Sequence, residues 1–242
     1  MEKLSEDSAM SYLYLDDNYR DITARIESAK KMADRTDEVE LLVAIKSATL
    51  DEIGYLVKTY GVKTVGENRV QQLLERYDAL KQMGVEIHFI GALQSNKVKY
   101  IIDKVDMIHS VDRISLAREI DKQAEKHGIV MDVLVEINSG REQNKSGVDP
   151  SDVLDFCREI ASFEHIRVRG FMTMGAKCEK NSEYLKYFCE TYQLVLDILH
   201  KKVHNIDVPI LSMGMSDSFE PAIAAGSTMV RIGRGMFSKK VK

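Results

Sequence analysis

Lys46 is the residue whose position most suggests covalent chemistry. It closes the apolar run Val39–Lys46, in which Leu42, Ala44 and Lys46 share one face by the alternation of a β-strand. A lysine that ends an apolar strand is expected to be partly desolvated, which disfavours its charged form. The neutral amine condenses with carbonyl groups. On this strand alone, a lysine held in an ordinary ion pair is the simpler interpretation.

Two segments near the end of the chain could bind a phosphate. Ser212–Ser216 and Arg231–Gly235 each follow an apolar run, and both contain glycine. Glycine lets backbone N–H groups approach phosphate oxygens closely, and serine hydroxyls supply further donors. One such segment is weak evidence, whereas two of them opposite a lysine indicate an anion site.

Arg231 shares its predicted strand face with Met229 and Gly233, so its side chain should point inward, below the second glycine segment. Arginine stays protonated and donates hydrogen bonds. Against a pyridine nitrogen such a donor would disfavour ring protonation and weaken the ring as an electron sink. The alternative is an ion pair with an interior carboxylate such as Glu136.

Eight short apolar runs, separated by helix-length segments, must position these residues. They are Val39–Lys46, Thr64–Glu67, Glu86–Gly91, Met107–Val111, Met131–Asn138, Ile166–Met174, Pro209–Gly214 and Thr228–Gly233. Strands that alternate with helices predict a parallel sheet, and eight such units close into a barrel. Functional residues of such barrels lie where the strands end, and phosphates often bind after strands seven and eight. We therefore predict an α/β fold, a TIM-type (β/α)8 barrel forming a single domain over residues 1–242.

Two local patterns add helices to this plan. Apolar and aromatic residues recur at steps of three and four before the first strand, which predicts an extra N-terminal helix. They are Tyr12, Leu15, Tyr19, Ile22, Ile26, Ala29 and Ala33. Asp217 and Glu220 have the spacing of a capping box, with Pro221 in the first turn of the helix that follows.

Composition excludes several classes of partner. The net charge of −4 gives no general attraction to nucleic acid or anionic membranes, and no run approaches the roughly 20 apolar residues of a membrane span. The first ten residues lack the apolar core of a signal peptide. Three cysteines without a CxxC pair suit a reducing compartment, and six histidines show no ligand spacing. We expect a cytoplasmic protein that binds no metal, nucleic acid or membrane.

Several segments, in the same order along nearly the whole chain, resemble the YggS/PROSC family of pyridoxal 5′-phosphate (PLP)-binding proteins. These PLP homeostasis proteins are similar to the barrel domain of alanine racemase. The segments are Val43–Lys46, Gly66–Gln71, His88–Gly91, Leu93–Lys97, Asn144–Gly147, Leu211–Ser216 and Ala222–Gly233. The resemblance implies the alanine racemase barrel of PLP fold type III.

The resemblance also implies roles for individual residues. It implies that PLP is held as a Schiff base on Lys46 and that Arg231 meets the pyridine nitrogen. Asn68 would line the same mouth. Phosphate contacts are implied for Ser212, Met215, Ser216, Gly233 and Arg234.

Some positions depart from the family pattern. Ala48 stands where a second lysine is common, which puts a second-lysine role in cofactor transfer in doubt, and Arg234 adds a charge near the phosphate. Ser218 stands where the family often has an aspartate. Gln94–Lys97 could contact a ligand, although a polar helix start is favoured. Lys145 could be a second aldehyde-reactive amine, although a solvated loop lysine is favoured.

The function implied by the resemblance is intracellular PLP homeostasis without catalysis. The chain would hold PLP as a monomer, with PLP-dependent apo-enzymes as candidate recipients. The alternative is a PLP-dependent amino-acid racemase, which needs acid/base groups on both faces of the substrate carbon. Alanine racemase takes one of them from a second domain, which we expect this chain to lack. A third reading, a Schiff-base aldolase for phosphorylated sugars, has no need of an arginine opposite the lysine.

Overall fold

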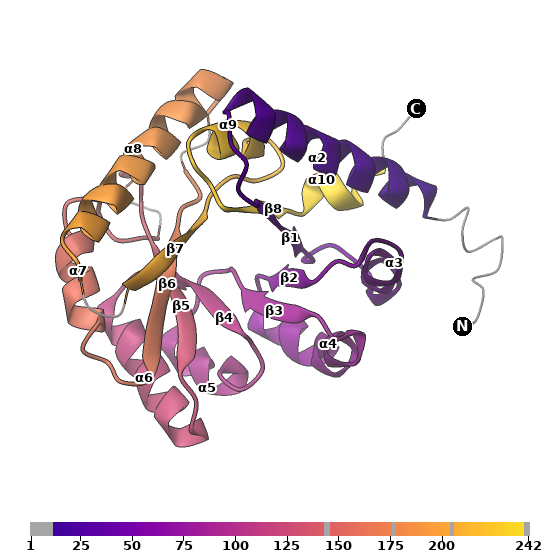
Figure 1. Ribbon diagram of the computed structural model, residues 1–242. Coiled ribbons are helices and arrows are strands. Elements are labelled where there is room, and N and C mark those ends of the chain that lie inside the picture. Colours follow the sequence, from indigo (N-terminus) through magenta and orange to yellow (C-terminus); the bar gives the residue numbers. More distant parts are fainter. Residues whose placement is uncertain (1–11, 143–145, 176–177, 204–205, 240–242) are drawn as a thin grey trace.

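Eight parallel strands close a barrel in the part of the chain that the structure describes, and helices surround it (Figure 1). The computed structural model describes residues 12–142, 146–175, 178–203 and 206–239, with the backbone alone at 206–209. The strands are β1 (Glu40–Ala44), β2 (Thr64–Glu67), β3 (Glu86–Phe89), β4 (Met107–Val111), β5 (Met131–Glu136), β6 (Ile166–Met172), β7 (Ile206–Ser212) and β8 (Met229–Ile232). Each strand pairs with its neighbour in sequence, and β8 pairs with β1. The predicted TIM-type barrel is confirmed.

The helices follow the strands in the alternation that the sequence predicts. They are α2 (Leu13–Met32), α3 (Leu50–Tyr60), α4 (Val70–Met83), the 3₁₀ turn η1 (Ser95–Lys97), α5 (Val98–Ile101), α6 (Ile114–His127), α7 (Val153–Ile160), α8 (Asn181–His200), α9 (Phe219–Ala224) and α10 (Arg234–Phe237). The favoured reading of Gln94–Lys97 as a helix start agrees with η1. None of the described helices is long and apolar enough to cross a membrane.

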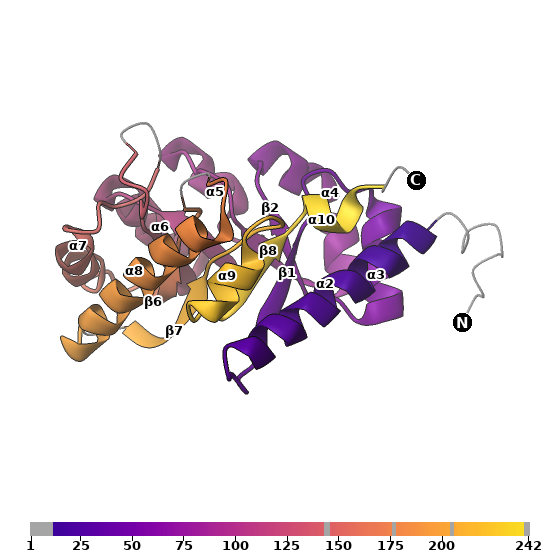
Figure 2. The same cartoon turned by 90° about the horizontal axis from the view of Figure 1, so that it is seen from above.

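The extra helix α2 covers the end of the chain. Its buried face carries Leu15, Ile22, Ile26 and Ala29, as the spacing predicts. It packs along α9 and α10 in both views (Figures 1 and 2). Asn18 joins the contact, because its side-chain amide donates to the backbone carbonyls of residues 236 and 238. The helix therefore supports the segment after β8.

The capping box predicted at Asp217 and Glu220 is wrong. Ser218 precedes α9 and makes no side-chain capping bond. The two acids are used in ion pairs instead, Asp217 with Arg234 and Glu220 with Arg25. The helix begins one residue later than this box requires, so Ser218 rather than Asp217 occupies the N-cap position.

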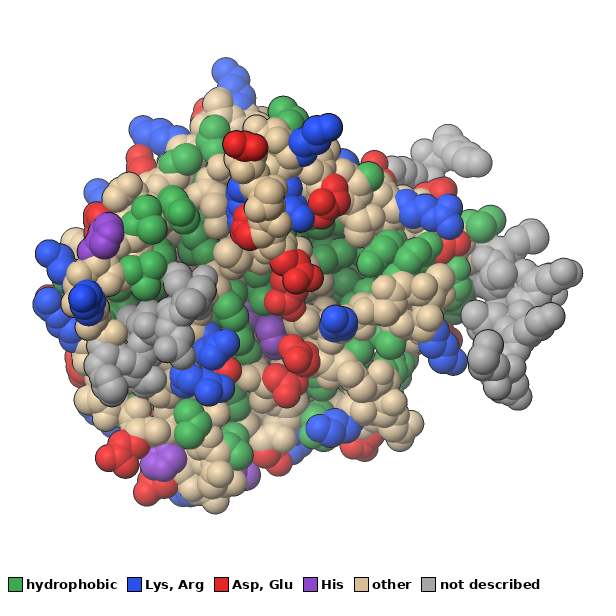
Figure 3. All heavy atoms as spheres, viewed as in Figure 1, with side chains coloured by type: hydrophobic (Ala, Val, Ile, Leu, Met, Phe, Trp, Pro, Cys, Tyr) green, Lys and Arg blue, Asp and Glu red, His purple; other side chains and the backbone are tan. Residues whose placement is uncertain are grey.

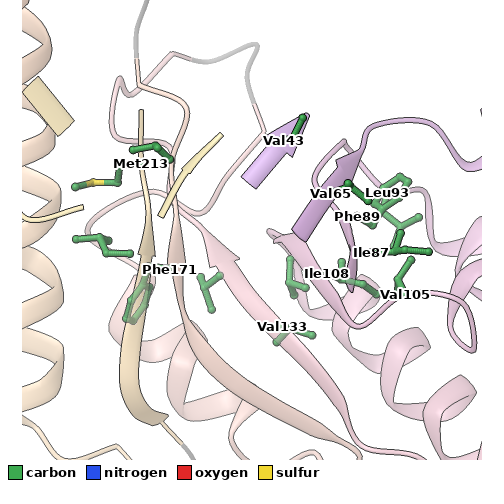
Figure 4. Close-up of a cluster of buried hydrophobic side chains, with 14 of the residues drawn as sticks. Val43, Val65, Ile87, Phe89, Leu93, Val105, Ile108, Val133, Phe171 and Met213 are labelled. Carbon is green, nitrogen blue, oxygen red and sulfur yellow. The ribbon is translucent and has the colours of Figure 1, made fainter. Parts of the chain in front are cut away.

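The main core lies between the barrel and its helices. Outward-facing strand residues fill this layer, among them Val43, Val65, Ile87, Ile108 and Val133 (Figure 4). Inward-facing residues form two small apolar clusters, Leu42 with Ile90 and Met229, and Met107 with Leu134 and Met172. The rest of the lumen carries buried polar side chains, which the next section describes.

Candidate cofactor-binding site

Lys46 lies two residues beyond β1, in a turn at the rim of the barrel, and is exposed. The ladder with β2 ends at Ala44, after which the Ile45 amide donates to the Gly66 carbonyl at 2.9 Å. The Ala48 amide then donates to the Ile45 carbonyl at 3.0 Å and closes the turn. The predicted place at the carboxyl end of strand one is correct, but the predicted partial desolvation is wrong because the chain turns outward first.

A buried carboxylate and an arginine hold this turn in place. Arg76 of α4 donates to the Ile45 carbonyl at 3.0 Å and lies 3.4 Å from the Glu67 carboxylate. Glu67 is fully buried and accepts the Asn68 amide at 2.7 Å. The ends of β1 and β2 are thus tied together, which fixes Lys46 and Asn68 on neighbouring strands. No role was predicted for Glu67 from the sequence, although a charged residue within the predicted strand Thr64–Glu67 indicated a special role.

The loops after β7 and β8 meet each other beside the end of β1. The Gly235 amide donates to Ser216 Oγ at 2.9 Å. A Cβ atom at Gly233 would lie 2.9 Å from the Ala44 carbonyl oxygen, so only glycine permits this approach. Gly214 has a φ of +90°, and a Cβ there would lie 2.7 Å from the Ala222 methyl group. The glycines are therefore required where a phosphate was predicted.

Backbone donors remain available in these two loops. Among the described residues, the N–H groups of Ser216, Gly233 and Arg234 have no hydrogen-bond acceptor. Backbone N–H groups gathered in this way form an anion-binding concavity. The donor set therefore fits a phosphate group.

Two predicted contacts are altered by local pairing. The Arg234 guanidinium forms an ion pair with Asp217, and both side chains are exposed. The charge that Arg234 adds is therefore offset by a carboxylate, and its backbone amide has no acceptor among the described residues. Met215 is exposed, and its amide donates to Ser218 Oγ at 3.2 Å. Ser218, a departure from the family pattern, thus shapes the loop.

Arg231 points into the barrel, as the alternation of strand eight predicts, and is only 4% exposed. Its Nη1 donates to the Ser212 carbonyl at 2.7 Å and to Ser212 Oγ at 2.8 Å. Its Nη2 donates to the Thr173 carbonyl at 3.0 Å. The guanidinium does not pair with Glu136. Burial lowers the pKa of Arg231 to about 10, so the group stays protonated at neutral pH.

The neighbouring ends of β5 and β6 shape the same end of the lumen. Glu136 is buried, and burial raises the pKa of its carboxyl group, while Ser146 Oγ donates to it at 2.7 Å. Thr173 Oγ1 donates to the Ile137 carbonyl at 2.9 Å and lies 2.8 Å from Ser139 Oγ. Thr173 and Ser139 were not predicted, because polar residues after a strand give no sign of their partners. Lys145 lies outside the described residues.

Asn68 also lines a cleft outside the barrel mouth. The cleft has a volume of about 630 Å³, and its other lining residues include Arg69, Gln94, Lys97 and Tyr100. The structure therefore brings Ser212 and Arg231 into direct contact and joins Ser216 to Gly235. Lys46 and Asn68 lie on neighbouring strand ends of the same rim. Within the described residues, no cluster of three or more metal-ligating side chains occurs.

Comparisons with known proteins agree with this arrangement. The profile of the family described as "Alanine racemase, N-terminal domain" matches residues 18–240. The "Pyridoxal phosphate homeostasis protein" of Aquifex aeolicus (strain VF5) is 39% identical over 219 residues, which are 90% of this chain and 95% of that protein. The crystal structure of an unknown protein from Bifidobacterium adolescentis is 32% identical, with a TM-score of 0.88 over 98% of each chain.

A second solved structure extends the likeness of fold. PipY of Synechococcus elongatus PCC7942, with PLP bound, has a TM-score of 0.75 at 24% identity and covers 88% of this chain and 100% of its own. The profile match and the identity to the Aquifex protein both extend over most of the chain. This chain therefore belongs to the alanine racemase N-terminal domain family and, within it, to the pyridoxal phosphate homeostasis proteins.

Proposed function

We propose that this chain binds PLP and serves in intracellular PLP homeostasis, and that it is not an amino-acid racemase. The observation that carries the proposal is Arg231, a buried cation held by carbonyl and hydroxyl oxygens rather than by a carboxylate. An arginine has five N–H donors, and three hydrogen bonds to described residues are made here. The remaining donors fit an uncharged ring nitrogen.

The other residues fit the remaining parts of the cofactor. PLP would supply an aldehyde for condensation with the Lys46 amine, which is exposed at the rim and makes no ion pair with the residues that the structure describes. The amides of Ser216, Gly233 and Arg234, with the Ser216 hydroxyl, would hold its phosphate. Ser212 would act through Arg231. Met215 and Asn68 would border the mouth of the site.

Arg231 also supports a binding role over catalysis. A protonated guanidinium beside the ring nitrogen would disfavour protonation of that nitrogen and so weaken the ring as an electron sink, the property that many PLP enzymes exploit. The Aquifex relative is named a pyridoxal phosphate homeostasis protein. In our proposal the chain acts as a cytoplasmic monomer that limits free aldehyde and releases PLP to apo-enzymes that depend on it.

Borohydride reduction tests the covalent assignment. The purified protein is saturated with PLP, reduced and digested, and the modified lysine is located by mass spectrometry. We expect the adduct on Lys46, and Lys46→Ala should lose it while keeping the wild-type circular dichroism. Lys97→Ala, in the outer cleft, is the matched control and should retain the adduct. An adduct found only at another lysine would reject the assignment.

A second experiment separates homeostasis from racemase activity. The PLP-loaded protein is incubated with L- and D-amino acids in heavy water, and exchange of the α-hydrogen and loss of optical purity are followed. We expect neither to proceed at an enzymatic rate, because the Arg231 guanidinium beside the ring nitrogen would leave PLP a weak electron sink. Rapid racemisation that depends on Lys46 would make the chain an enzyme.

A further inference from the structure

Two buried histidines extend the contacts of Arg231 through the lumen of the barrel. His88 of β3 is 3% exposed and His109 of β4 is fully buried. His109 Nε2 lies 3.0 Å from His88 Nδ1, and His109 Nδ1 lies 3.4 Å from Ser212 Oγ. Since Ser212 Oγ also accepts from Arg231, four side chains form one continuous hydrogen-bonded chain.

The donors and acceptors of this chain follow from its first member. A guanidinium only donates, so Ser212 Oγ must accept from Arg231 and can direct its own proton to His109 Nδ1. His109 then carries its proton on Nε2 and donates to His88 Nδ1. His88 in turn carries its proton on Nε2, which lies 4.0 Å from a carboxylate oxygen of Glu86.

The opposite set of hydrogen bonds, in which each imidazole donates through Nδ1, is disfavoured at both ends of the hydrogen-bonded chain. It would place a bare nitrogen of His88 opposite the Glu86 carboxylate, so two acceptors would face each other. It would also leave the buried Ser212 hydroxyl proton without an acceptor among the described residues. An unsatisfied buried donor costs about 1–3 kcal/mol. Both imidazoles therefore take the Nε2–H tautomer.

The surroundings keep both imidazole rings neutral, as this chain of hydrogen bonds requires. Burial lowers the pKa of His88 to about 4, although Asp106 and Asp132 oppose the shift. Burial, His88 and the Arg231 charge lower the pKa of His109 well below its ordinary value. Glu86 opens β3, so the chain runs from the cofactor end of the lumen toward the start of the strands. Figure 3 shows acidic side chains beside a histidine near the middle of the face it views.

We propose that His109, supported by His88, is a positioning residue for Arg231. The two imidazoles hold the Ser212 hydroxyl in the orientation that accepts from Nη1, and so they hold the guanidinium where a cofactor ring would meet it. This inference rests on the proposed PLP function. It assigns a binding role to a buried pair that no metal-ligand pattern in the sequence explains.

Nuclear magnetic resonance of ¹⁵N-histidine protein tests the hydrogen-bond direction without any cofactor. Two-bond nitrogen–proton correlations distinguish the Nε2–H tautomer from the Nδ1–H tautomer. We expect His88 and His109 to show the Nε2–H pattern at pH 7, and we expect His88 to remain neutral to pH 5. An Nδ1–H tautomer at His109 would contradict the proposed direction of these hydrogen bonds.

Cofactor titration tests the positioning role. His109→Leu removes the acceptor that faces Ser212, whereas His109→Asn places an amide oxygen near the position of Nδ1. We expect PLP affinity to fall about tenfold in His109→Leu, with a shifted absorbance maximum, and to change less than about threefold in His109→Asn. His200→Asn is the control and should match the wild type. Equal affinity and equal spectra for His109→Leu and the wild type would overturn the inference.

The two levels of proposal fail in different ways. If wild-type protein does not bind PLP on Lys46, the proposed function is wrong, while the tautomers still report on the buried chain. If the wild type binds PLP and His109→Leu binds it equally well, only the positioning role is wrong. If His109→Leu does not fold, His109→Asn against the wild type and the tautomer spectra decide the matter.

Discussion

Arg231 keeps its charge available because oxygen dipoles, rather than a carboxylate, satisfy it. Its acceptors are the carbonyl groups of Ser212 and Thr173 and the Ser212 hydroxyl. Arg76 differs, since it lies 3.4 Å from the buried Glu67 carboxylate. The first arginine can interact with a ligand, whereas the second is committed to structure.

Removing Arg231 should destabilise the protein even without a ligand. Arg231→Leu removes the Arg231 donor from the buried Thr173 carbonyl and leaves the Ser212 carbonyl with the Thr173 amide alone, and a buried group left unsatisfied costs about 1–3 kcal/mol. We expect the free energy of unfolding to fall by about 2–4 kcal/mol in urea denaturation. Arg158→Leu, at an exposed site on α7, should change it by less than about 0.5 kcal/mol. Similar values for the two variants would show that the buried contacts contribute little.

Phosphate should supply much of the affinity for the cofactor. The amides of Ser216, Gly233 and Arg234 are its proposed donors, and a charge-assisted hydrogen bond is worth about 1.5–3 kcal/mol. Pyridoxal, which lacks the phosphate, should therefore bind at least about a hundredfold more weakly than PLP in fluorescence titration. Ser216→Ala should reduce the difference in affinity between PLP and pyridoxal. Equal affinities for the two vitamers would contradict the assignment of these loops.

The sequence predicts which face of a strand a residue occupies better than it predicts partners across the lumen. Alternation placed Arg231 inside correctly, because its register opposite Leu42 follows from the apolar pattern. Lys46 was expected to be desolvated, but the turn begins at Ile45, and the local sequence does not show where a ladder ends. The chain from Ser212 to His109 joins β7 to β4 across the lumen, a contact set by barrel closure.

At the scale of elements, a distortion in β6 positions the acceptors of Arg231. Against β5, the register shifts between Val133 and Leu134, where β6 has one extra residue, and Gly170 has a φ of +146°. Beyond this point Met172 pairs with Ser212, and the Thr173 amide donates to the Ser212 carbonyl at 3.1 Å. The bulge thus brings the Thr173 and Ser212 carbonyl groups side by side. Apolar alternation cannot predict such a bulge, because one extra residue changes the face of all that follow.

Gly170→Ala should therefore damage both stability and binding. A Cβ atom there would collide with the backbone of Ile210, and the positive φ adds strain. We expect a loss of at least about 2 kcal/mol in urea denaturation, together with weaker PLP binding. Gly54→Ala is the matched control, since Gly54 lies within α3 and a Cβ atom there would meet only the end of Met83 at 3.5 Å. The control should be neutral or gain up to about 1 kcal/mol. Equal effects would show that β6 tolerates the change.

At the scale of the whole molecule, the barrel combines an apolar outer layer with a lumen that is polar over much of its length. The core between strands and helices provides the packing, so the lumen can hold His88, His109, Glu136 and Arg231. Buried ionisable groups make folding depend on pH, because each has a different proton affinity in the unfolded chain. As the pH changes, His88 and Glu136 alter the free energy of unfolding in opposite directions.

The stability of the protein should fall with acidification, starting near pH 6.5. The pKa of His88 is about 4 in the folded state against 6.5 ordinarily, so the unfolded chain binds this proton first as the pH falls. The contribution of neutral His88 is complete above pH 6.5 and is lost progressively down to about pH 4. At about 1.4 kcal/mol per pKa unit, the loss approaches about 3 kcal/mol.

His109, with a pKa lowered by burial, His88 and Arg231, changes stability in the same direction. The raised pKa of Glu136 acts oppositely, since its stabilising contribution is present below its ordinary value and is lost as the pH rises.

Urea denaturation between pH 7.5 and pH 5 isolates the histidine contribution. His88→Asn removes the titrating ring and keeps an acceptor near the position of Nδ1, so its unfolding free energy should change less over this range than that of the wild type. His200→Asn, which alters an exposed histidine, should follow the wild-type curve. The groups facing His88 are Glu86, Asp106, Asp132 and His109, and all remain in the variant, so its difference from the wild type reports the ring itself. Parallel curves for His88→Asn and the wild type would show that His88 gains its proton as easily in the folded barrel as in the unfolded chain.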